Sequence, residues 1–578
     1  MKLLSYHENG IYIVWGVDEK QELRLLHVSS LPFQKEDIKV ESMDYGFRFV
    51  ELQLSGFDRP YERHGNKYIV TAPGYRMKYV SHSESRNENG LQLLFVLRDD
   101  LTDVYVDAYV QFYDGLAIVR MWQVIRNEGT ETQTVEYISG FNYEGIEKEG
   151  LAPRDEKMRV WIPHNSWQRE LNWKCYTLPE LGMDQIQPER IQRSSGMIRI
   201  SNTGNWSAKE YLPMAYLENT CVGTGLFWQI EHNGSWHWEI GDQNGHLYLA
   251  VSGPNEIYSH WFKNLTSGES FTSVPVAVGV TGAPECEHDG LNQAIDTLTA
   301  YRRRIRRENE DNKKLPVIFN DYMNCLWGHP TEEEEYPLID AAAEAGCEYF
   351  CIDAGWYADG DWWDSVGEWK ESKKRFPGGV RKVTDYIRSK GMIPGVWLEM
   401  EVMGIYCDLA KEFPDEYFFV RHGKRVYDRS RYQLDYHNPK VREYADSVID
   451  RIVKEYGVGY IKMDYNIEPG IGTEIGTESM GQGMLEHERA YLKWLEGVWA
   501  RYPDLIIENC SSGGLRMDYA MLSRYSIQST SDQDDYRLYA TIAANAPTAV
   551  TPAQAAVWAY PMNHEEEVSE RALQEETV

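Results

Sequence analysis

Apolar and polar residues alternate along most of the first 290 residues of the chain. In residues 104–124 (VYVDAYVQFYDGLAIVRMWQV) the alternation has a period of two on both sides of an Asp-Gly pair, which is typical of two strands joined by a hairpin turn. Residues 237–253 repeat the pattern around an Asn-Gly pair. Strands at this density, with no convincing long helix among them, predict a large β-sandwich over residues 1–290.

The spacing of apolar residues becomes helical near residue 290. Residues 291–314 predict a helix that ends in a run of charges, and we interpret it as a solvated helical linker instead of a binding patch. From residue 315, short apolar runs alternate with amphipathic segments such as 441–457. This alternation predicts parallel strands joined by crossover helices over residues 315–578.

Each of these predicted strands is apolar at its start and carries a reactive residue at its C-terminal end. A doubly wound sheet and a (β/α)8 barrel both fit the alternation, but only a barrel gathers every strand end around one mouth. Six consecutive strands that end in this way favour a (β/α)8 TIM barrel, with weaker patterns for the last two strands at 547–553 and 556–562. The strand-end residues are Asp321, Asp353, Glu399, Glu401, Asp464, Glu508, Cys510 and Asp532.

The composition argues against several classes of partner. A formal net charge of −31 does not suit binding to nucleic acid or to an anionic membrane surface. The eight cysteines are scattered without a C-x-x-C pair, which favours a reducing compartment over a disulfide framework or a zinc site. The N-terminus turns polar after four residues and no 18-residue apolar run follows, so we expect a cytoplasmic protein without a signal peptide or membrane span.

A lysine and an aspartate lie two positions apart in residues 459–466 (GYIKMDYN), so both point to the same side of a predicted strand. Burying two charges is costly unless they pair or take part in chemistry. Carboxylates at a barrel mouth, with tryptophans nearby, suggest glycoside hydrolysis, which needs an attacking or water-activating carboxylate and a proton-donating one. No metal-ligand spacing accompanies them, and we do not interpret the Cys-Glu-His-Asp run at 286–289 as a metal site, so no metal or cofactor is expected.

Three ordered motifs in the second half resemble those of glycoside hydrolase family 36, the α-galactosidase family of clan D. They are YIKMDYN, then CSSGGLRMDYAML beginning 46 residues after Asp464, and STSDQDD. The similarity covers roughly residues 315–560, and the β-rich half resembles the N-terminal super-sandwich of these enzymes. The resemblance implies a retaining, exo-acting α-glycosidase that hydrolyses terminal α-linked galactosyl residues of α-galactosides by double displacement. It assigns Asp464 as the nucleophile, which forms a covalent glycosyl-aspartate, and Asp532 as the acid/base.

The resemblance also implies which residues hold the sugar. Lys462 would hydrogen-bond the sugar hydroxyls and keep Asp464 ionised, and the CSSGG turn would hold the 2-position of the sugar. Either of two arginines, Arg429 or Arg431, would lie near the nucleophile. The substrate-binding residues expected on this basis are Asp353, Lys462, Cys510, Ser511, Gly513, Trp397, Arg429, Arg431, Tyr322, Asn466 and Trp356.

One departure from the family bears on the substrate. Many family members read DDGW after the second strand, where the paired aspartates bind the 4- and 6-hydroxyls of galactose, but here Asp353 is followed by Ala354. Either Asp361 or Asp321 replaces the lost carboxylate, or the sugar differs. The alternatives are therefore an α-N-acetylgalactosaminidase or α-galactosaminidase, a raffinose-synthase-like transglycosylase, and a catalytically silent sugar-binding protein.

A second departure concerns the end of the chain. Family members usually add a C-terminal β-sandwich, whereas almost nothing follows the predicted barrel here, so we expect that domain to be missing. Family members are often homo-oligomers, and a homo-oligomer is an assembly that the resemblance allows.

Overall fold

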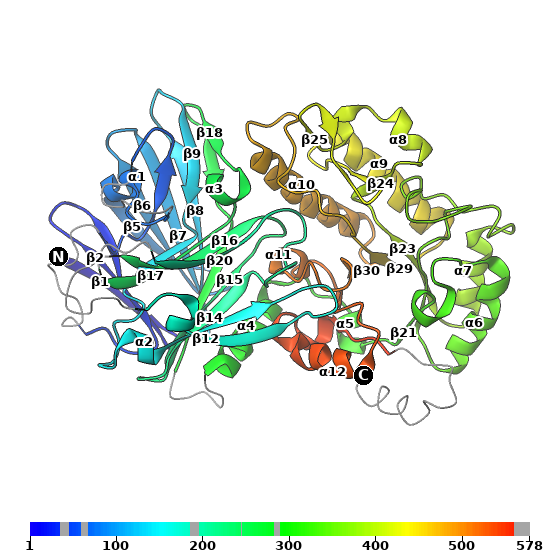
Figure 1. Ribbon diagram of the computed structural model, residues 1–578, viewed down its shortest axis with the longest axis horizontal. Helices are drawn as coiled ribbons and strands as arrows, with labels where there is room; N and C mark the ends of the chain where they lie inside the picture. The colour runs from blue at the N-terminus through cyan, green and yellow to red at the C-terminus, as the bar shows by residue number, and fades with distance from the viewer. Residues whose placement is uncertain (35–45, 59–66, 185–195, 244, 283–289, 560–578) are drawn as a thin grey trace.

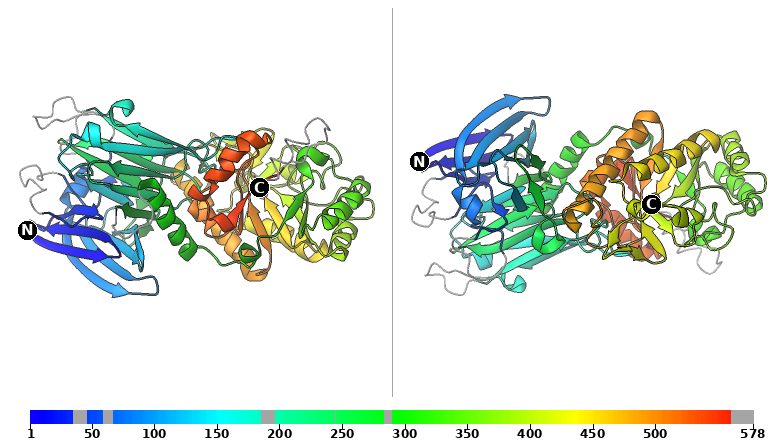
Figure 2. Two further views of the ribbon diagram at one scale, coloured as in Figure 1. Left: turned by 90° about the horizontal axis from the view of Figure 1, so that it is seen from below. Right: turned by 90° about the horizontal axis from the view of Figure 1, so that it is seen from above.

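The structure is a computed structural model of the chain. Figures 1 and 2 show two lobes side by side along the long axis, a β lobe that holds the N-terminus and an α/β lobe formed by the second half of the chain. The residues that the structure describes are 1–34, 46–58, 67–184, 196–243, 245–282 and 290–559.

The largest sheet of the β lobe has ten strands. In spatial order they are β12 (Asn172–Thr177), β11 (Met158–His164), β14 (Met214–Asn219), β15 (Thr224–Ile230), β20 (Val276–Thr281), β8 (Leu116–Asn127), β7 (Val104–Tyr113), β6 (Leu91–Asp99) and β5 (Lys78–Arg86), with β19 (Ser270–Thr272) also paired to β8. β6 alternates buried and half-buried residues, as expected of a strand with one face on a core. The hairpin predicted within 104–124 is confirmed, because β7 and β8 pair antiparallel around Asp114-Gly115.

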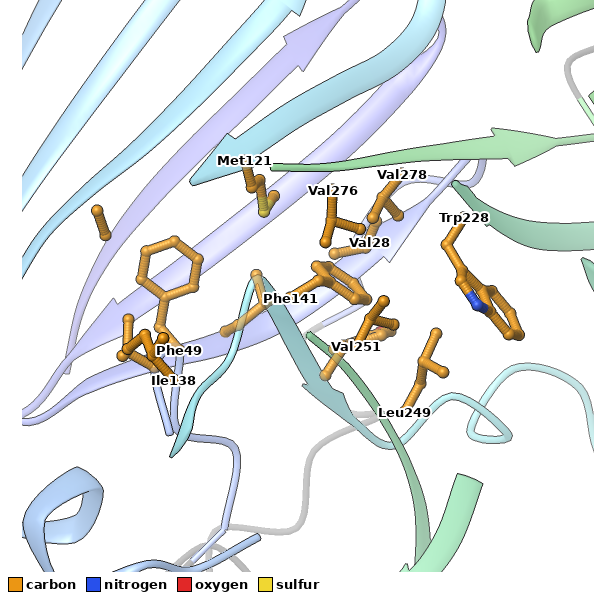
Figure 3. Close-up of a cluster of buried hydrophobic side chains, with 14 of the residues drawn as sticks. Val28, Phe49, Met121, Ile138, Phe141, Trp228, Leu249, Val251, Val276 and Val278 are labelled. Atoms are coloured by element: carbon orange, nitrogen blue, oxygen red, sulfur yellow. The ribbon is translucent and has the colours of Figure 1, made fainter. Parts of the chain in front are cut away.

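Three smaller sheets complete the β lobe. They are β1 (Lys2–Glu8), β2 (Ile11–Val17) and β3 (Leu23–Ser29); β10 (Phe141–Glu144), β17 (His246–Ser252), β16 (Trp236–Gln243) and β13 (Met197–Asn202); and β18 (Lys263–Leu265), β9 (Gln133–Ile138) and β4 (Leu52–Leu54). β16 and β17 pair antiparallel, as predicted for 237–253, although Asn244 of their turn lies outside the described residues. Figure 3 shows part of the core, where Phe141 of β10 and Val251 of β17 lie close to Val276 of β20. The predicted β-rich first half is therefore confirmed.

The helix predicted within 291–314 is confirmed as α4 (Gly290–Ile305), and the short α5 (Asp311–Lys314) follows it. The sequence predicted that the charge run of this helix is solvated. The structure differs, because Arg302 is buried. The Arg302 guanidinium donates to Gln229 Oε1 of β15 and to the main-chain oxygen of Thr548, each at 2.9 Å. α4 thus joins the β lobe to the far end of the α/β lobe. The domain boundaries at 290 and 314 stay predictions.

The α/β lobe contains one sheet of seven parallel strands in chain order. They are β21 (Ile318–Asn320), β22 (Tyr349–Ile352), β23 (Ile393–Leu398), β29 (Tyr460–Met463), β30 (Ile506–Asn509), β31 (Ile527–Ser529) and β32 (Ala555–Ala556). The first six confirm the six strands predicted from the sequence. A doubly wound sheet reverses its strand order at a switch point, so that alternative is wrong. Because the strands are parallel, their C-terminal ends all meet at one edge.

Helices alternate with these strands and share their core. The longer ones are α6 (Glu332–Glu344), α7 (Val380–Ser389), α9 (Pro439–Asp450), α10 (Met480–Arg501) and α12 (Tyr536–Asn545) (Figure 1). On α9, the buried residues Val441, Ala445 and Val448 recur at helical spacing, as predicted. An insertion after β23 carries β24 (Val402–Gly404), α8 (Asp408–Glu412), β25 (Val420–Arg421), β26 (Lys424–Arg425), β27 (Tyr427–Asp428) and β28 (Arg431–Gln433). The α/β lobe also has the short helix α11 (Tyr519–Leu522). The β lobe has the short helices α1 (Ala72–Arg76), α2 (Arg154–Lys157) and α3 (Glu256–Ser259).

Closure into an eight-stranded barrel is not confirmed. Within the described residues β32 pairs only with β31, so the sheet is an open part of a barrel. Residues 547–553, predicted as a strand, instead form 3-10 turns that contain Pro547 and Pro552, which lack the N–H that a strand ladder needs. β32 reaches only the first residue of the other predicted strand, 556–562, whose last three residues lie outside the described part of the chain.

Candidate active site

A cavity of about 530 Å³ lies at the C-terminal ends of the parallel strands, with walls from both lobes. Of its twenty lining residues, eight are aromatic and ten are polar or charged. A concave site that combines aromatic rings with placed polar groups is typical of a binding site for a small organic molecule. The seven tryptophans that line it are Trp167, Trp206, Trp327, Trp362, Trp363, Trp397 and Trp558.

Asp464 follows β29 and accepts four hydrogen bonds. Its Oδ1 accepts from the main-chain N–H groups of Tyr465 (2.8 Å) and Ser512 (3.2 Å). Its Oδ2 accepts from the Asn466 side-chain amide (2.9 Å) and from the Trp397 indole N–H (3.1 Å). Because every one of these partners donates, they hold the carboxylate in a fixed orientation.

Lys462 lies on β29, two residues before Asp464, and also lines the cavity, as the spacing predicts. Its ammonium pairs with Asp353, with 2.9 Å between Nζ and Oδ2, and the Asn320 amide donates to the same oxygen at 2.6 Å. Burial acts to lower the pKa of Lys462, but neighbouring carboxylates led by Asp353 raise it well above its ordinary value. The lysine of this strand is therefore charged and paired.

Asp532 follows β31 and lines the same cavity as Asp464. Burial, and next the negative charge of Asp464, raise the pKa of Asp532 to about 6. Its Oδ2 accepts a hydrogen bond from the indole N–H of Trp167 at 3.2 Å. Two carboxyl groups in one site with different surroundings can divide the roles of acid and base between them.

The structure brings most of the residues predicted from the sequence together around this cavity. Of the two candidate arginines, Arg429 reaches the cavity and Arg431 does not. Burial raises the pKa of Tyr322 to about 12, so its hydroxyl keeps its proton at neutral pH. The predicted residues that line the cavity are Asp464, Asp532, Asp353, Lys462, Trp397, Arg429, Tyr322 and Asn466.

Two predicted residues lie behind the cavity wall and support it. Arg431 is buried in an ion pair with Glu399, whose Oε1 accepts the main-chain N–H of Asn466 at 2.6 Å. Trp356 is also buried, and its indole donates to the main-chain oxygen of Trp397 at 3.0 Å. Neither lines the cavity, so we assign both to holding the residues that do, instead of to contact with a ligand.

The CSSGG turn contributes a different residue from those predicted. Cys510 and Ser511 are buried, and neither they nor Gly513 line the cavity. Ser512 lines it instead and donates its main-chain N–H to Asp464. Gly513 has φ +81, and a Cβ there would lie 2.7 Å from the main-chain nitrogen of Asp532. The glycine therefore lets the turn that touches Asp464 pack directly against the segment that carries Asp532.

A sequence model of the melibiase family matches residues 274–567, which is half of the chain. The chain belongs to the melibiase family. Two curated relatives are the α-galactosidase Mel36A of Lactobacillus acidophilus, 25% identical over 76% of this chain and 57% of its own length, and α-galactosidase 1 of Pediococcus pentosaceus, 24% identical over 74% of this chain and 55% of its own length. The chain thus spans little more than half the length of these relatives.

A solved structure of similar fold is that of the GH36 α-galactosidase AgaA from Geobacillus stearothermophilus. The two superpose with a TM-score of 0.83 over all of this chain and 82% of AgaA, at 18% sequence identity. Together with the family match, this likeness confirms the resemblance to glycoside hydrolase family 36 that the three motifs indicated. At this identity the superposition establishes a shared fold.

Three residues of the cavity come from the β lobe, and none of them was predicted from the sequence. Trp167 and Gln168 lie in the turn between β11 and β12, and Trp206 follows β13. The Trp206 indole donates to the main-chain oxygen of Tyr465 at 3.1 Å, next to Asp464. No motif marks these positions, because they reach the site only through the packing of one lobe against the other.

Two missed residues of the α/β lobe lie directly beside predicted ones. Asn320 precedes Asp321, and Ser512 lies between Ser511 and Gly513. Both line the cavity. The motifs therefore located segments that line the cavity, and the roles of their side chains stay predictions.

Ala354 lies outside the cavity lining, and neither of its predicted substitutes reaches the cavity. Asp321 Oδ1 accepts the main-chain N–H of Asp353 at 2.7 Å, and Asp361 Oδ1 accepts that of Trp363 at 2.8 Å. The main-chain N–H of Ala354 in turn donates to Asp353 Oδ1 at 2.8 Å. Asp321 and Asp361 thus each accept a main-chain N–H beside the cavity. That a neighbour replaces the family's second aspartate, or that the sugar differs, stays a prediction.

The described part of the chain offers no cluster of three or more His, Cys, Asp or Glu side chains that could bind a metal ion. Residues 286–289, which were not predicted to be a metal site, lie outside the described residues. Among the described helices, none has the length and apolar character needed to cross a membrane.

Proposed function

We propose that this chain is a retaining, exo-acting α-galactosidase that hydrolyses terminal α-linked galactosyl residues through a covalent glycosyl-aspartate. The observation that carries the proposal is the contrast between two aspartates in one cavity. Asp464 accepts hydrogen bonds on both carboxylate oxygens, whereas the pKa of Asp532 is raised to about 6. Retaining glycosidases need an ionised carboxylate that attacks and a second carboxyl group that protonates.

The relatives agree with this substrate class. Mel36A and the Pediococcus enzyme are named α-galactosidases, and solved structures of AgaA variants contain raffinose and stachyose. These statements concern the relatives, and their extension to this chain is part of the proposal.

In the first step, a carboxylate oxygen of Asp464 would attack C1 of the sugar. The bond between C1 and the glycosidic oxygen breaks, its electron pair goes to that oxygen, and Asp532 gives the oxygen its proton. This assignment uses the four donors that orient the Asp464 carboxylate, and the raised pKa that lets Asp532 hold a proton below about pH 6.

In the second step, the Asp532 carboxylate would remove a proton from water as the water oxygen attacks C1. The bond between C1 and Asp464 breaks and returns its electron pair to the carboxylate. Two displacements at the same carbon restore the original anomeric configuration. Both aspartates end in their starting states, so no cofactor is needed.

Lys462, Asp353 and Asn320 would bind the sugar hydroxyls as one connected group. The ammonium of Lys462 has three donors, and Asp353 uses one. The remaining donors, with the carboxylate of Asp353, suit vicinal hydroxyls that each donate and accept. Trp397 would pack its ring against the sugar, since its indole N–H is already directed to Asp464.

The experiment that tests this proposal follows an aryl α-galactoside by proton NMR as the enzyme hydrolyses it. The proposal predicts that α-galactose appears first and then mutarotates to the β anomer. Release of β-galactose first would contradict double displacement. The same assay with aryl glycosides of N-acetylgalactosamine, galactosamine and glucose tests the substrate, and faster hydrolysis of any of these would contradict the assignment to galactose.

A further inference from the structure

The turn at residues 165–171 joins β11 to β12 and carries the β lobe into contact with the segment that holds Asp532. In Figure 1, the cyan strand β12 extends from the β lobe toward the centre of the molecule. The Gln168 side-chain amide donates to the main-chain oxygen of Asp532 at 3.3 Å, and the Gln533 amide donates back to the main-chain oxygen of Gln168 at 3.0 Å. Asn165 adds a bond to the main-chain oxygen of Gly514 at 3.1 Å.

Glu170 links this turn to the residue that precedes Asp532. Its Oε2 accepts the Ser531 hydroxyl at 2.6 Å, and its Oε1 accepts the main-chain N–H of Gln168 at 3.2 Å. Glu170 is 2% exposed. Each oxygen of this buried carboxyl group accepts a hydrogen bond from a different segment, so the group fixes the distance between the two segments. Burying the carboxyl group is costly unless both hydrogen bonds are kept.

The carboxylate of Asp532 depends on the same turn. Among the described residues, only the Trp167 indole N–H donates a hydrogen bond to the side-chain oxygens of Asp532. Trp167 is 56% exposed at the mouth of the cavity. An exposed tryptophan contributes little to the core, so its position is explained better by the group that its N–H holds.

We propose that the 165–171 turn of the β lobe is a positioning element for the acid/base. Trp167 orients the carboxylate of Asp532, and Glu170 holds the backbone on which that carboxylate is carried. The inference rests on the proposed function, in which Asp532 protonates the leaving oxygen. Trp167 and Glu170 are positioning residues, because they act on the substrate through Asp532.

The charged and titratable groups around Asp532 set the expected pH effect. The strand ends contribute Asp464, Lys462, Asp353 and Cys510, and the β lobe contributes Glu170. Tyr322 and Tyr539 also interact with Asp532. The Trp167 N–H favours the ionised form of Asp532, so its loss raises the pKa of this carboxyl. The acid form then persists to higher pH, and the basic limb of kcat/KM moves upward.

Trp173 provides a matched control on the same hairpin. Its indole N–H donates to the hydroxyl of Thr548 at 2.9 Å, so it also crosses from the β lobe to the second half of the chain. It does not line the cavity. Trp167→Phe and Trp173→Phe therefore each remove one indole hydrogen bond between the β lobe and the second half of the chain. Only the bond of Trp167 is made to Asp532.

The test measures kcat/KM and its pH profile for both variants on two substrates, a 2,4-dinitrophenyl α-galactoside and raffinose, with the full chain. Since acid catalysis contributes about 10²–10⁴-fold and its geometry would be only partly lost, we expect about a tenfold lower kcat on raffinose for Trp167→Phe. We expect less than about a twofold change on the activated substrate, which needs little protonation. Trp173→Phe should leave both rates and the basic limb unchanged.

Glu170→Ala and Glu170→Gln form the second pair. The glutamine keeps an oxygen that can accept from Ser531 and should restore most of the raffinose activity that the alanine loses. Equal effects of Trp167→Phe and Trp173→Phe, or equal losses on both substrates, would overturn the proposal. If Glu170→Ala does not fold, the tryptophan pair decides the question. An unmodified enzyme that hydrolyses neither substrate would refute the proposed function instead.

Discussion

The two aspartates of the cavity are held in different ways. All four donors to Asp464 come from the α/β lobe, at the ends of β23 and β29 and in the turn after β30. The contacts of Asp532 with Trp167 and Gln168 come from the β lobe, more than 360 residues earlier in the chain. The proposed nucleophile is therefore preorganised by one lobe, whereas the proposed acid depends on the packing of two.

This difference separates two demands of the proposed chemistry. An attacking carboxylate must be fixed in position, which a rigid sheet edge with convergent donors provides. A proton donor must hold a proton at working pH, which needs burial and few donors. Asp532 lies where the two lobes meet. The contact between the lobes buries its carboxyl group, and few N–H groups of the strand ends surround it.

Asp464→Ala should have the largest effect. Because it removes the attacking atom itself, hydrolysis of an aryl α-galactoside should fall by at least about 10⁴-fold, measured as kcat. The thermal midpoint should change little, because three of the four donor residues, Trp397, Asn466 and Ser512, line the cavity, where water can replace the carboxylate. Substantial activity in a purified, folded Asp464→Ala protein would contradict the assignment of the nucleophile.

Asp532→Ala should have the second-largest effect, and one that depends on the leaving group. Natural substrates should lose about 10²–10⁴-fold in kcat/KM, and a 2,4-dinitrophenyl α-galactoside much less. The pKa of Asp532 is raised to about 6, and the acid form exists below that value. The activity of the unmodified enzyme should thus decline as pH rises through about 6, and this limb should vanish in the variant. A limb that persists would assign the acid elsewhere.

Lys462→Met should change stability more than an exposed lysine does. It leaves Asp353 buried without its cation, and breaking a buried pair costs about 3–5 kcal/mol of unfolding free energy. Lys454→Met is the control, because Lys454 pairs with Asp450 at 2.8 Å on the surface, where such pairs contribute about 0–1 kcal/mol. Urea unfolding measures both variants. Equal losses of unfolding free energy in Lys462→Met and Lys454→Met would contradict a stabilising role of the Lys462–Asp353 pair at the strand ends.

The strand-end side of the site could be predicted from the sequence because two local rules place it. Parallel strands bring their C-terminal ends to one edge, and a two-residue spacing puts Lys462 and Asp464 on one side. The same rules located the segments of Asp353 and of the CSSGG turn, from which Ser512 lines the cavity. These contacts need only the order of strands in one sheet.

The side of the cavity that the β lobe contributes could not be predicted, because no local rule relates residue 167 to residue 532. The alternation of apolar residues identifies strands in the β lobe, but it does not say which turn meets the other lobe. The end of the sheet was predicted incorrectly for a local reason, since Pro547 and Pro552 place turns where a strand was expected. Closure of the barrel stays a prediction.

The central claim is that Asp464 forms a covalent bond to C1 of the sugar. The most direct measurement incubates the full-length enzyme with 5-fluoro-α-galactosyl fluoride, digests it and locates the label by mass spectrometry. The account predicts one added fluorogalactosyl group on the peptide that contains Asp464, at the aspartate itself, and no label in Asp464→Ala. A label on Asp532 or another residue, or inactivation without a covalent adduct, would contradict it.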